Sequence, residues 1–213
     1  ANAHALDDML SYIAGNTNMH MKTSMKSIRD RFMRAPYGFV EDDVFWLVAK
    51  LFRRGDLVFT INGVQVSLLN KSKEEIISFI IRKQFAEKLL VEQRIRISDR
   101  EKKTCHDVMK ELFNTSSTND DEDAVMQTFI RYSGNLLDEI GKIEVRYETA
   151  SYPGRSVIDE GRKLLVAVIR VQSTAEFYKF IQSKQDDFIN FGTYYEPIKE
   201  FFKGEQKEIF DRA

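Results

Sequence analysis

The dipeptide Asn62-Gly63, placed between two runs of alternating apolar residues, constrains this chain more than any other short segment. The runs at 57–61 and 64–69 have the period of two that is expected of β-strands. An Asn-Gly pair readily supplies the two positive φ angles that a two-residue hairpin turn needs. The sequence therefore predicts a β-hairpin over these residues.

Three short helices are predicted in front of the hairpin, over residues 5–14, 24–33 and 40–54. Apolar residues recur at three-to-four spacing in each, as on the buried face of an amphipathic helix. The turn formers at 15–18 should end the first helix, and Pro36 should end the second. Three helices followed by a hairpin is the element order of a winged helix, in which the second and third helices form a helix-turn-helix corner. We therefore predict a winged-helix-like domain over residues 1–70.

A helix, a strand and a second helix are predicted to connect this domain to the rest of the chain, over residues 71–115. The apolar residues of 72–88 have helical spacing, whereas those of 91–97 alternate with charged residues as in a strand. This strand can pair with the hairpin and extend its small sheet. The second helix of the connector opens with Ser98 and Glu101 in the spacing of a capping box.

A helical bundle is predicted for residues 122–213, beyond a polar loop at 114–123 that we expect to be the main internal boundary. Two long helices with apolar faces, over 124–147 and 156–171, are joined by turn formers at 152–154. Such a pair should pack antiparallel. The predicted fold class is therefore mainly α with a small β-hairpin or sheet: a winged-helix-like N-terminal part followed by a helical bundle.

Aromatic residues crowd the end of the chain, where Ser173 and Glu176 form another capping box. Pro197 is expected near the start of a further helix, where its missing N–H costs little. Adjacent aromatics such as Tyr194 and Tyr195 cannot both face one core, so part of this set should be exposed and covered by other parts of a longer protein. The set consists of Phe188, Phe191, Tyr194, Tyr195, Phe201, Phe202 and Phe210.

The charges of the chain are nearly balanced, with 32 Lys and Arg against 33 Asp and Glu. This balance gives no global attraction to nucleic acid or to an anionic membrane. No apolar run approaches the roughly 18 residues that span a bilayer, and no signal peptide is apparent. The single cysteine, Cys105, excludes an internal disulfide and suits a reducing compartment. We therefore expect a cytoplasmic location and no membrane partner.

No motif for catalysis or metal binding is found in the sequence. It contains no G-x-x-x-x-G-K-[ST], G-x-G-x-x-G or G-x-S-x-G run. The histidines His4, His20 and His106 lack metal-ligand spacing, and the neighbours Cys105 and His106 would point about 100° apart on a helix. The acidic run at 120–123 lacks the glycine and the spaced glutamate of a calcium loop. We therefore expect no catalytic residue, no metal site, no cofactor and no enzymatic activity.

The charge distribution of the predicted helix-turn-helix does not favour DNA binding. The N-terminal half of a recognition helix faces base edges, but here it carries Glu41, Asp42 and Asp43, which DNA phosphates would repel. A solvated face, a contact with a protein partner and a contact with the DNA backbone remain alternatives for the basic residues nearby. These candidates for DNA or partner contacts are Lys22, Lys26, Arg29, Arg31, Arg34, Lys50, Arg53 and Arg54.

Packing and turn patterns lie at 35–39, 46–49, 51–56, the hairpin at Asn62-Gly63, 152–154, 201–206 and 209–211. Together these segments resemble a region of the large P-loop ATPase protein of BREX-type bacteriophage exclusion systems. The resemblance covers most of this chain but a minor part of that large protein. It implies an ATPase parent that acts in defence against phage, with its nucleotide site outside these residues because no Walker-type residues match.

The residues and the resemblance together predict a non-catalytic interaction or coupling module of such a phage-defence ATPase. The first residue is alanine, which fits a piece of a longer protein. The expected partners are other domains of the parent protein and subunits of the defence system. The long hairpin at 124–171 would be a lever or scaffold, and the winged helix a protein-interaction surface. The alternative is a DNA-binding winged-helix module or transcriptional regulator that uses the basic second helix.

Overall fold

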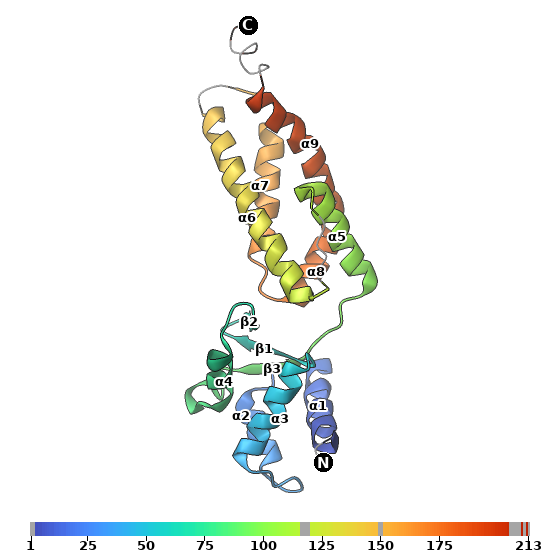
Figure 1. The fold of residues 1–213 in the computed structure, drawn as a ribbon, viewed down its shortest axis with the longest axis vertical. Helices are drawn as coiled ribbons and strands as arrows, with labels where there is room; N and C mark the ends of the chain where they lie inside the picture. The colour runs from blue at the N-terminus through green and yellow to red at the C-terminus, as the bar shows by residue number, and fades with distance from the viewer. Residues whose placement is uncertain (1–2, 116–119, 149–150, 205–209, 211, 213) are drawn as a thin grey trace. The chain divides into compact units, whose positions relative to one another are not determined.

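The computed structural model describes residues 3–115, 120–148, 151–204, 210 and 212. The chain divides into two compact units, residues 1–96 and 97–213, which Figure 1 shows in blue to green and in green to red. Each unit is mainly helical, and the first also contains a three-stranded antiparallel sheet. The predicted fold class is confirmed.

The first unit has the element order of a winged helix. Its strands pair in the order β2-β1-β3, so the third strand extends the hairpin as predicted. Asn62 and Gly63 both have positive φ, at 53° and 80°, which is the requirement that made this dipeptide predict a tight turn. The described elements are α1 (Ala3–Asn18), α2 (Met25–Phe32), α3 (Glu41–Arg53), β1 (Leu57–Ile61), β2 (Val64–Val66), α4 (Lys73–Ile81), the 3-10 helix η1 (Lys83–Phe85) and β3 (Leu90–Gln93).

Helix α1 continues to Asn18, through the turn formers that predict its end near Ala14. The polar residues of this last turn bind other segments instead of breaking the helix. Asn16 is buried and donates a hydrogen bond from Nδ2 to Thr23 Oγ1 at 3.0 Å. Thr17 Oγ1 accepts a hydrogen bond from the backbone N–H of Gln93 at 3.1 Å. These tertiary contacts outweigh the local turn preference.

Helix α4 ends at Ile81, although helical spacing predicts a helix to residue 88. Arg82 is extended, with φ −81° and ψ 128°, and a single 3-10 turn follows it. This change of direction allows Leu89 to reach the core, where it is fully buried. The backbone N–H of Met25 then donates to the carbonyl of Leu89 at 2.9 Å, which joins this segment to the start of α2.

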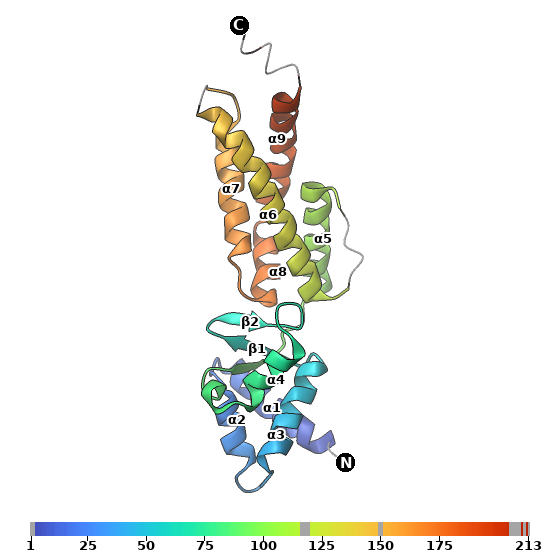
Figure 2. The ribbon, with the colours of Figure 1, turned by 60° about the vertical axis from the view of Figure 1, so that its left-hand side comes forward.

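The second unit is formed by helices in its described part. Helices α6 and α7 lie side by side and antiparallel in both views, as predicted for the long hairpin (Figures 1 and 2). Helix α5 packs against α8 and α9. The helices are α5 (Asp99–Phe113), α6 (Glu122–Tyr147), α7 (Arg155–Ile169), α8 (Thr174–Ser183) and α9 (Gln185–Lys203).

The division between residues 96 and 97 differs from the predicted boundaries at residue 70 and in the loop at 114–123. Strand β3 belongs to the first unit because it pairs with β1 from Leu57↔Gln93 to Thr60↔Leu90. Helix α5 belongs to the second unit because its buried face packs on α8 and α9. The connector predicted over 71–115 is therefore divided between the two units.

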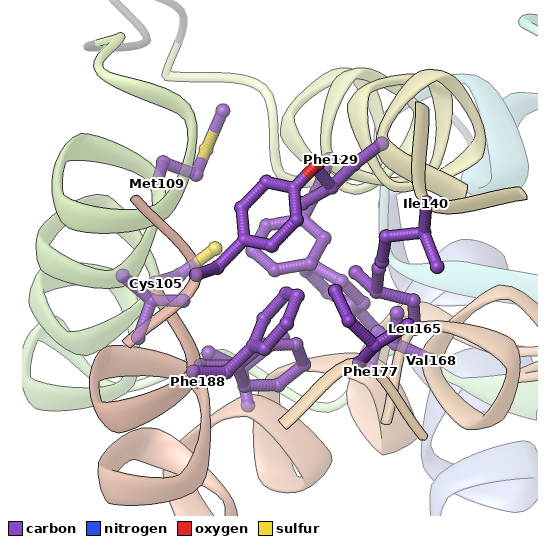
Figure 3. Close-up of a cluster of buried hydrophobic side chains, with 14 of the residues drawn as sticks. Cys105, Met109, Phe129, Ile140, Leu165, Val168, Phe177 and Phe188 are labelled. Carbon is purple, nitrogen blue, oxygen red and sulfur yellow. The ribbon is translucent and has the colours of Figure 1, made fainter. Parts of the chain in front are cut away.

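The core of the second unit is rich in aromatic side chains (Figure 3). Phe129 of α6 is fully buried and lies at its centre. Its ring makes edge-to-face contacts with Phe113 at 5.1 Å, Phe177 at 5.3 Å and Phe188 at 5.6 Å between centroids. These three rings come from α5, α8 and α9, so one side chain joins four helices of the bundle.

Helix α9 differs from the prediction at Pro197, which lies inside the helix and not near its start. Proline lacks the N–H that a helix interior uses, but Phe188, Phe191 and Tyr195 anchor the preceding turns in the core. The neighbouring aromatics divide as expected: Tyr194 is 61% exposed whereas Tyr195 is 4% exposed.

The predicted capping box at Ser98 and Glu101 is present at the start of α5. Ser98 Oγ accepts from the Glu101 N–H at 3.2 Å, and Glu101 Oε2 accepts from the Ser98 N–H at 2.8 Å. Hydrogen bonds from the side chain and backbone of Ser98 lower the pKa of Glu101. The stabilisation that comes from this shift is therefore present above the ordinary glutamate pKa and is lost as the pH falls through the lowered value.

We expect Ser98→Ala to lower the free energy of unfolding of the second unit by about 1 kcal/mol near neutral pH. The loss should shrink as the pH falls through the lowered pKa of Glu101, because the carboxyl is then protonated in both the folded and the unfolded state. Urea unfolding at neutral pH and over an acid pH series measures both effects. Ser156→Ala is the control, because Ser156 is exposed at the start of α7 and caps nothing. Equal losses for the two variants would contradict the cap.

Candidate interaction surface

The residues considered for catalysis or metal binding do not form a reactive site in the described part of the chain. Cys105 is fully buried in the core shown in Figure 3, and burial raises the pKa of its thiol to about 12. His106 is half-buried beside it on α5. The described residues contain no group of three or more His, Cys, Asp or Glu side chains that could hold a metal ion. None of the described helices has the length and apolarity of a membrane span.

The basic residues around α2 are partly neutralised by nearby carboxylates. Lys26 pairs with Glu87, and this hydrogen bond raises the pKa of Lys26. Arg29 pairs with Asp30 at 3.3 Å and with Glu41 at 3.4 Å. Of the five candidates in this region, two are therefore paired with carboxylates and less available to a phosphate backbone.

The other three candidates around α2 are placed differently. The Arg31 guanidinium lies over the Tyr12 ring, 4.5 Å from its centroid. Lys22 and Arg34 are exposed and form no ion pair with any residue that the structure describes. A cation without a carboxylate neighbour can still meet a phosphate or an acidic partner, so these two keep the predicted alternative open.

A hollow of about 620 Å³ lies beside α2 and brings some of these candidates together. The segment after α4 adds Lys83 and Lys88, which are not among the candidates predicted from the sequence. The fold-back that brings them to α2 is a tertiary feature, so no local pattern could have found them. The charged lining residues are Lys26, Arg29, Asp30, Arg34, Glu41, Lys83, Glu87 and Lys88.

The exposed face of α3 has acidic residues at one end and basic residues at the other. The opposite face packs in the core through Val44, Leu47, Val48 and Leu51. Because α3 turns about 100° per residue, the remaining side chains form one exposed band along the helix. We call this band the α3 stripe: Asp42, Asp43, Trp46, Lys50, Arg53 and Arg54.

Trp46 lies in the middle of the α3 stripe and is the only tryptophan of the chain. Its side chain is 47% exposed, and Lys50 Nζ lies 4.5 Å from the ring centroid. Trp46 is not among the contact residues predicted from the sequence. A usable signal was present, because Trp46 is four residues from both Asp42 and Lys50 and therefore shares their face.

The basic end of the α3 stripe contains the last three predicted candidates. Lys50 is held against Trp46, and Arg54 Nε pairs with Asp56 Oδ2 at 2.7 Å. Arg53 forms no ion pair within the described residues. The order of charges, acidic at the start and basic at the end, also matches the helix dipole.

A second hollow, of about 650 Å³, lies between α7, α8 and α9 of the other unit. Leu164, Phe180 and Phe191 contribute apolar surface, and the exposed Tyr194 also lines it. Gly161 allows the Phe191 ring to approach the α7 backbone, because a Cβ at this position would be 2.0 Å from Phe191 Cε2.

The two units define a protein of the helix-turn-helix class in which a winged helix is followed by a helical domain. Residues 1–95 match the family model of the BREX ATP-binding protein BrxC winged helix-turn-helix domain. Residues 101–213 match that of the BREX ATP-binding protein BrxC alpha helical domain. The second match covers more than half of the chain, so the chain belongs to the BrxC family of BREX phage-defence systems. No solved structure matches it.

The family matches confirm the resemblance seen in the turn and packing motifs. The two matched ranges meet between residues 95 and 101, where the structure also divides the chain. Membership in a BREX family supports a role in defence against phage.

Proposed function

We propose that this chain is a non-catalytic interaction and coupling module of a BREX system, and that its winged helix docks a protein through the α3 stripe. The observation that carries the proposal is the acidic start of α3, the position from which a helix-turn-helix protein reads DNA. Asp42 and Asp43 are both exposed there. Two carboxylates at this point repel phosphates and attract a basic protein surface.

The centre of the α3 stripe also fits a protein partner. Exposed tryptophan and arginine are enriched among the residues that dominate binding energy at protein interfaces. Trp46 offers a large apolar area, and Lys50, Arg53 and Arg54 lie next to it on the same face. A partner with an apolar centre and a complementary charge order would cover both ends of the stripe.

The helical unit supports the coupling part of the proposal. Helix α6 has 26 residues and therefore extends over about 39 Å. Arg162 of α7 forms an ion pair with Glu144 of α6, and the Lys199 ammonium of α9 lies 3.9 Å from the Glu139 carboxylate of α6. Packed side chains and ion pairs of this kind would let a displacement of one helix be carried along the bundle. The family name describes the parent as ATP-binding, and this unit would pass on its movements.

DNA-backbone binding through α2 is the second candidate function, and the hollow beside α2 is the observation that favours it. Arg34, Lys83 and Lys88 line this hollow and form no ion pair within the described part of the chain. They would contact phosphates without reading base sequence. The carboxylates of Asp30, Glu41 and Glu87 in the same hollow oppose such binding, so we favour the protein-docking function.

We expect the chain to bind duplex DNA no more tightly than about 10⁻⁴ M at roughly physiological salt, the weak end of non-specific binding. Fluorescence anisotropy with a labelled duplex over a salt series measures this. Arg34→Glu with Lys88→Glu should change nothing, and Arg100→Glu with Lys103→Glu on α5 makes the same charge change outside the hollow as a control. Tight binding that falls steeply with salt and is lost in the first variant alone would replace our proposal with the DNA-binding function.

A further inference from the structure

We infer that the α3 stripe pairs with the α3 stripe of a second copy of this chain, antiparallel and centred near Val48. This inference rests on the proposed function, because it names the partner of the proposed docking surface. It comes from the order of residues on α3, in which each acidic or aromatic position has a basic counterpart at nearly the same distance on the other side of Val48.

The positions along the helix match closely. A two-fold axis at Val48, perpendicular to α3, places Asp42 opposite the partner's Arg53 and Asp43 opposite the partner's Arg54. The same axis places Trp46 opposite the partner's Lys50. The midpoint of each pair lies within half a residue of Val48, which is about 0.75 Å along the helix axis.

The positions around the helix match as well. Asp42 and Arg53 are separated by about 20° in a helical projection and lie on one flank of the stripe. Asp43 and Arg54 are separated by about the same angle on the other flank. A two-fold axis perpendicular to two antiparallel helices keeps each residue on its own flank, so the opposite charges meet. Such an interface is isologous and closes with two copies.

Three of the four charged side chains that would meet across this axis have no ion pair in one copy, among the residues that the structure describes. Asp42, Asp43 and Arg53 form no ion pair within the described residues. Arg54 is 44% exposed in its pair with Asp56, and exposed pairs of this kind rearrange at little cost. A parallel pairing would place carboxylate against carboxylate, whereas the antiparallel pairing also opposes the two helix dipoles. One helix pair buries less area than a standard interface, so we expect a weak, salt-dependent dimer.

Sedimentation equilibrium of the 213-residue chain and of charge-reversed variants tests this inference. We expect the wild type to dimerise more tightly at low salt. One variant carries Asp42→Lys and Asp43→Lys, and the other Arg53→Glu and Arg54→Glu. The self-association constant of each variant alone should be at least tenfold lower than that of the wild type. An equimolar mixture of the two variants should form a heterodimer. The control variant Asp7→Lys with Asp8→Lys makes the same charge change on exposed positions of α1 and should dimerise like the wild type.

Circular dichroism shows whether the reversed variants fold, because charges opposed to the dipole weaken a helix end. If either variant unfolds, the milder Asp42→Asn with Asp43→Asn should still weaken the dimer at least threefold. A wild type that stays monomeric at low salt overturns the inference, and so does a mixture that fails to associate. If the wild type is monomeric and does not bind DNA, only the self-pairing is overturned. If the wild type binds DNA tightly, the proposed function is overturned.

Discussion

Replacing Phe129 by alanine should lower the free energy of unfolding of the helical unit by about 3–5 kcal/mol. The ring is fully buried and contacts Phe113, Phe177 and Phe188 from three other helices. Its removal forfeits the transfer free energy of a phenyl group and leaves a cavity where α5, α6, α8 and α9 meet (Figure 3). Helices packed around such a cavity cannot close it fully, which is why the loss exceeds the transfer term.

Thermal unfolding followed by circular dichroism measures this loss, and Trp46 fluorescence separates the two units. The only tryptophan lies in the winged helix, so its signal reports on that unit. The midpoint temperature for unfolding of the helical unit should fall, while the midpoint temperature reported by Trp46 fluorescence should not change. Tyr194→Ala removes an aromatic ring that is 61% exposed and should cost less than about 0.5 kcal/mol. Similar losses in the two variants would mean that Phe129 is not a central core residue.

Replacing Gly161 by alanine should destabilise the same unit by about 1–3 kcal/mol, although alanine is the better helix former. A Cβ at this position of α7 would lie 2.0 Å from Cε2 and 2.4 Å from Cδ2 of Phe191. The Phe191 ring is 6% exposed and must move away from α7 to make room. The overpacking and the altered contact of α7 with α9 therefore exceed the gain in helix propensity.

Gly141→Ala is a matched control with the opposite expected sign. Gly141 lies within α6 of the same unit, and a Cβ there would meet no atom within 4 Å. This variant should therefore gain up to about 1 kcal/mol from helix propensity alone. Adding Phe191→Leu to Gly161→Ala should recover part of the loss. Urea unfolding of the wild type, Gly161→Ala, Phe191→Leu and the double variant gives the coupling energy. A stabilised Gly161→Ala variant would show that the ring moves without cost.

Most of the predictions that held depend on signals that lie within a few residues of one another. The Asn62-Gly63 turn needs two adjacent positive φ angles, and the cap at Ser98 needs a glutamate three residues later. The buried face of α3 also follows from the spacing of its own apolar residues. The unpredicted features depend on distant partners: α1 runs past residue 14 because Asn16 meets Thr23, and α4 stops at Ile81 because Leu89 enters the core.

Some features of the candidate site could likewise be predicted from the sequence, and others could not. The acidic start of α3 and the basic residues around α2 are visible in the sequence, because charge and helical spacing are local properties. The neutralisation of Lys26 by Glu87 is not visible there, because the two residues lie far apart in the chain and meet only after the segment beyond α4 folds back.

The kinds of elements, their order and the winged-helix character of the front of the chain follow from the sequence, because turn chemistry, capping and apolar periodicity act between neighbours. The tertiary structure alone decided that α5 belongs with the bundle. It also decided which cations form no ion pair within the described residues. Helix α9 continues through Pro197 because the aromatic residues before it are buried in the core. These outcomes depend on hydrogen-bond pairing and burial between residues that the sequence keeps apart, and no local preference carries that information.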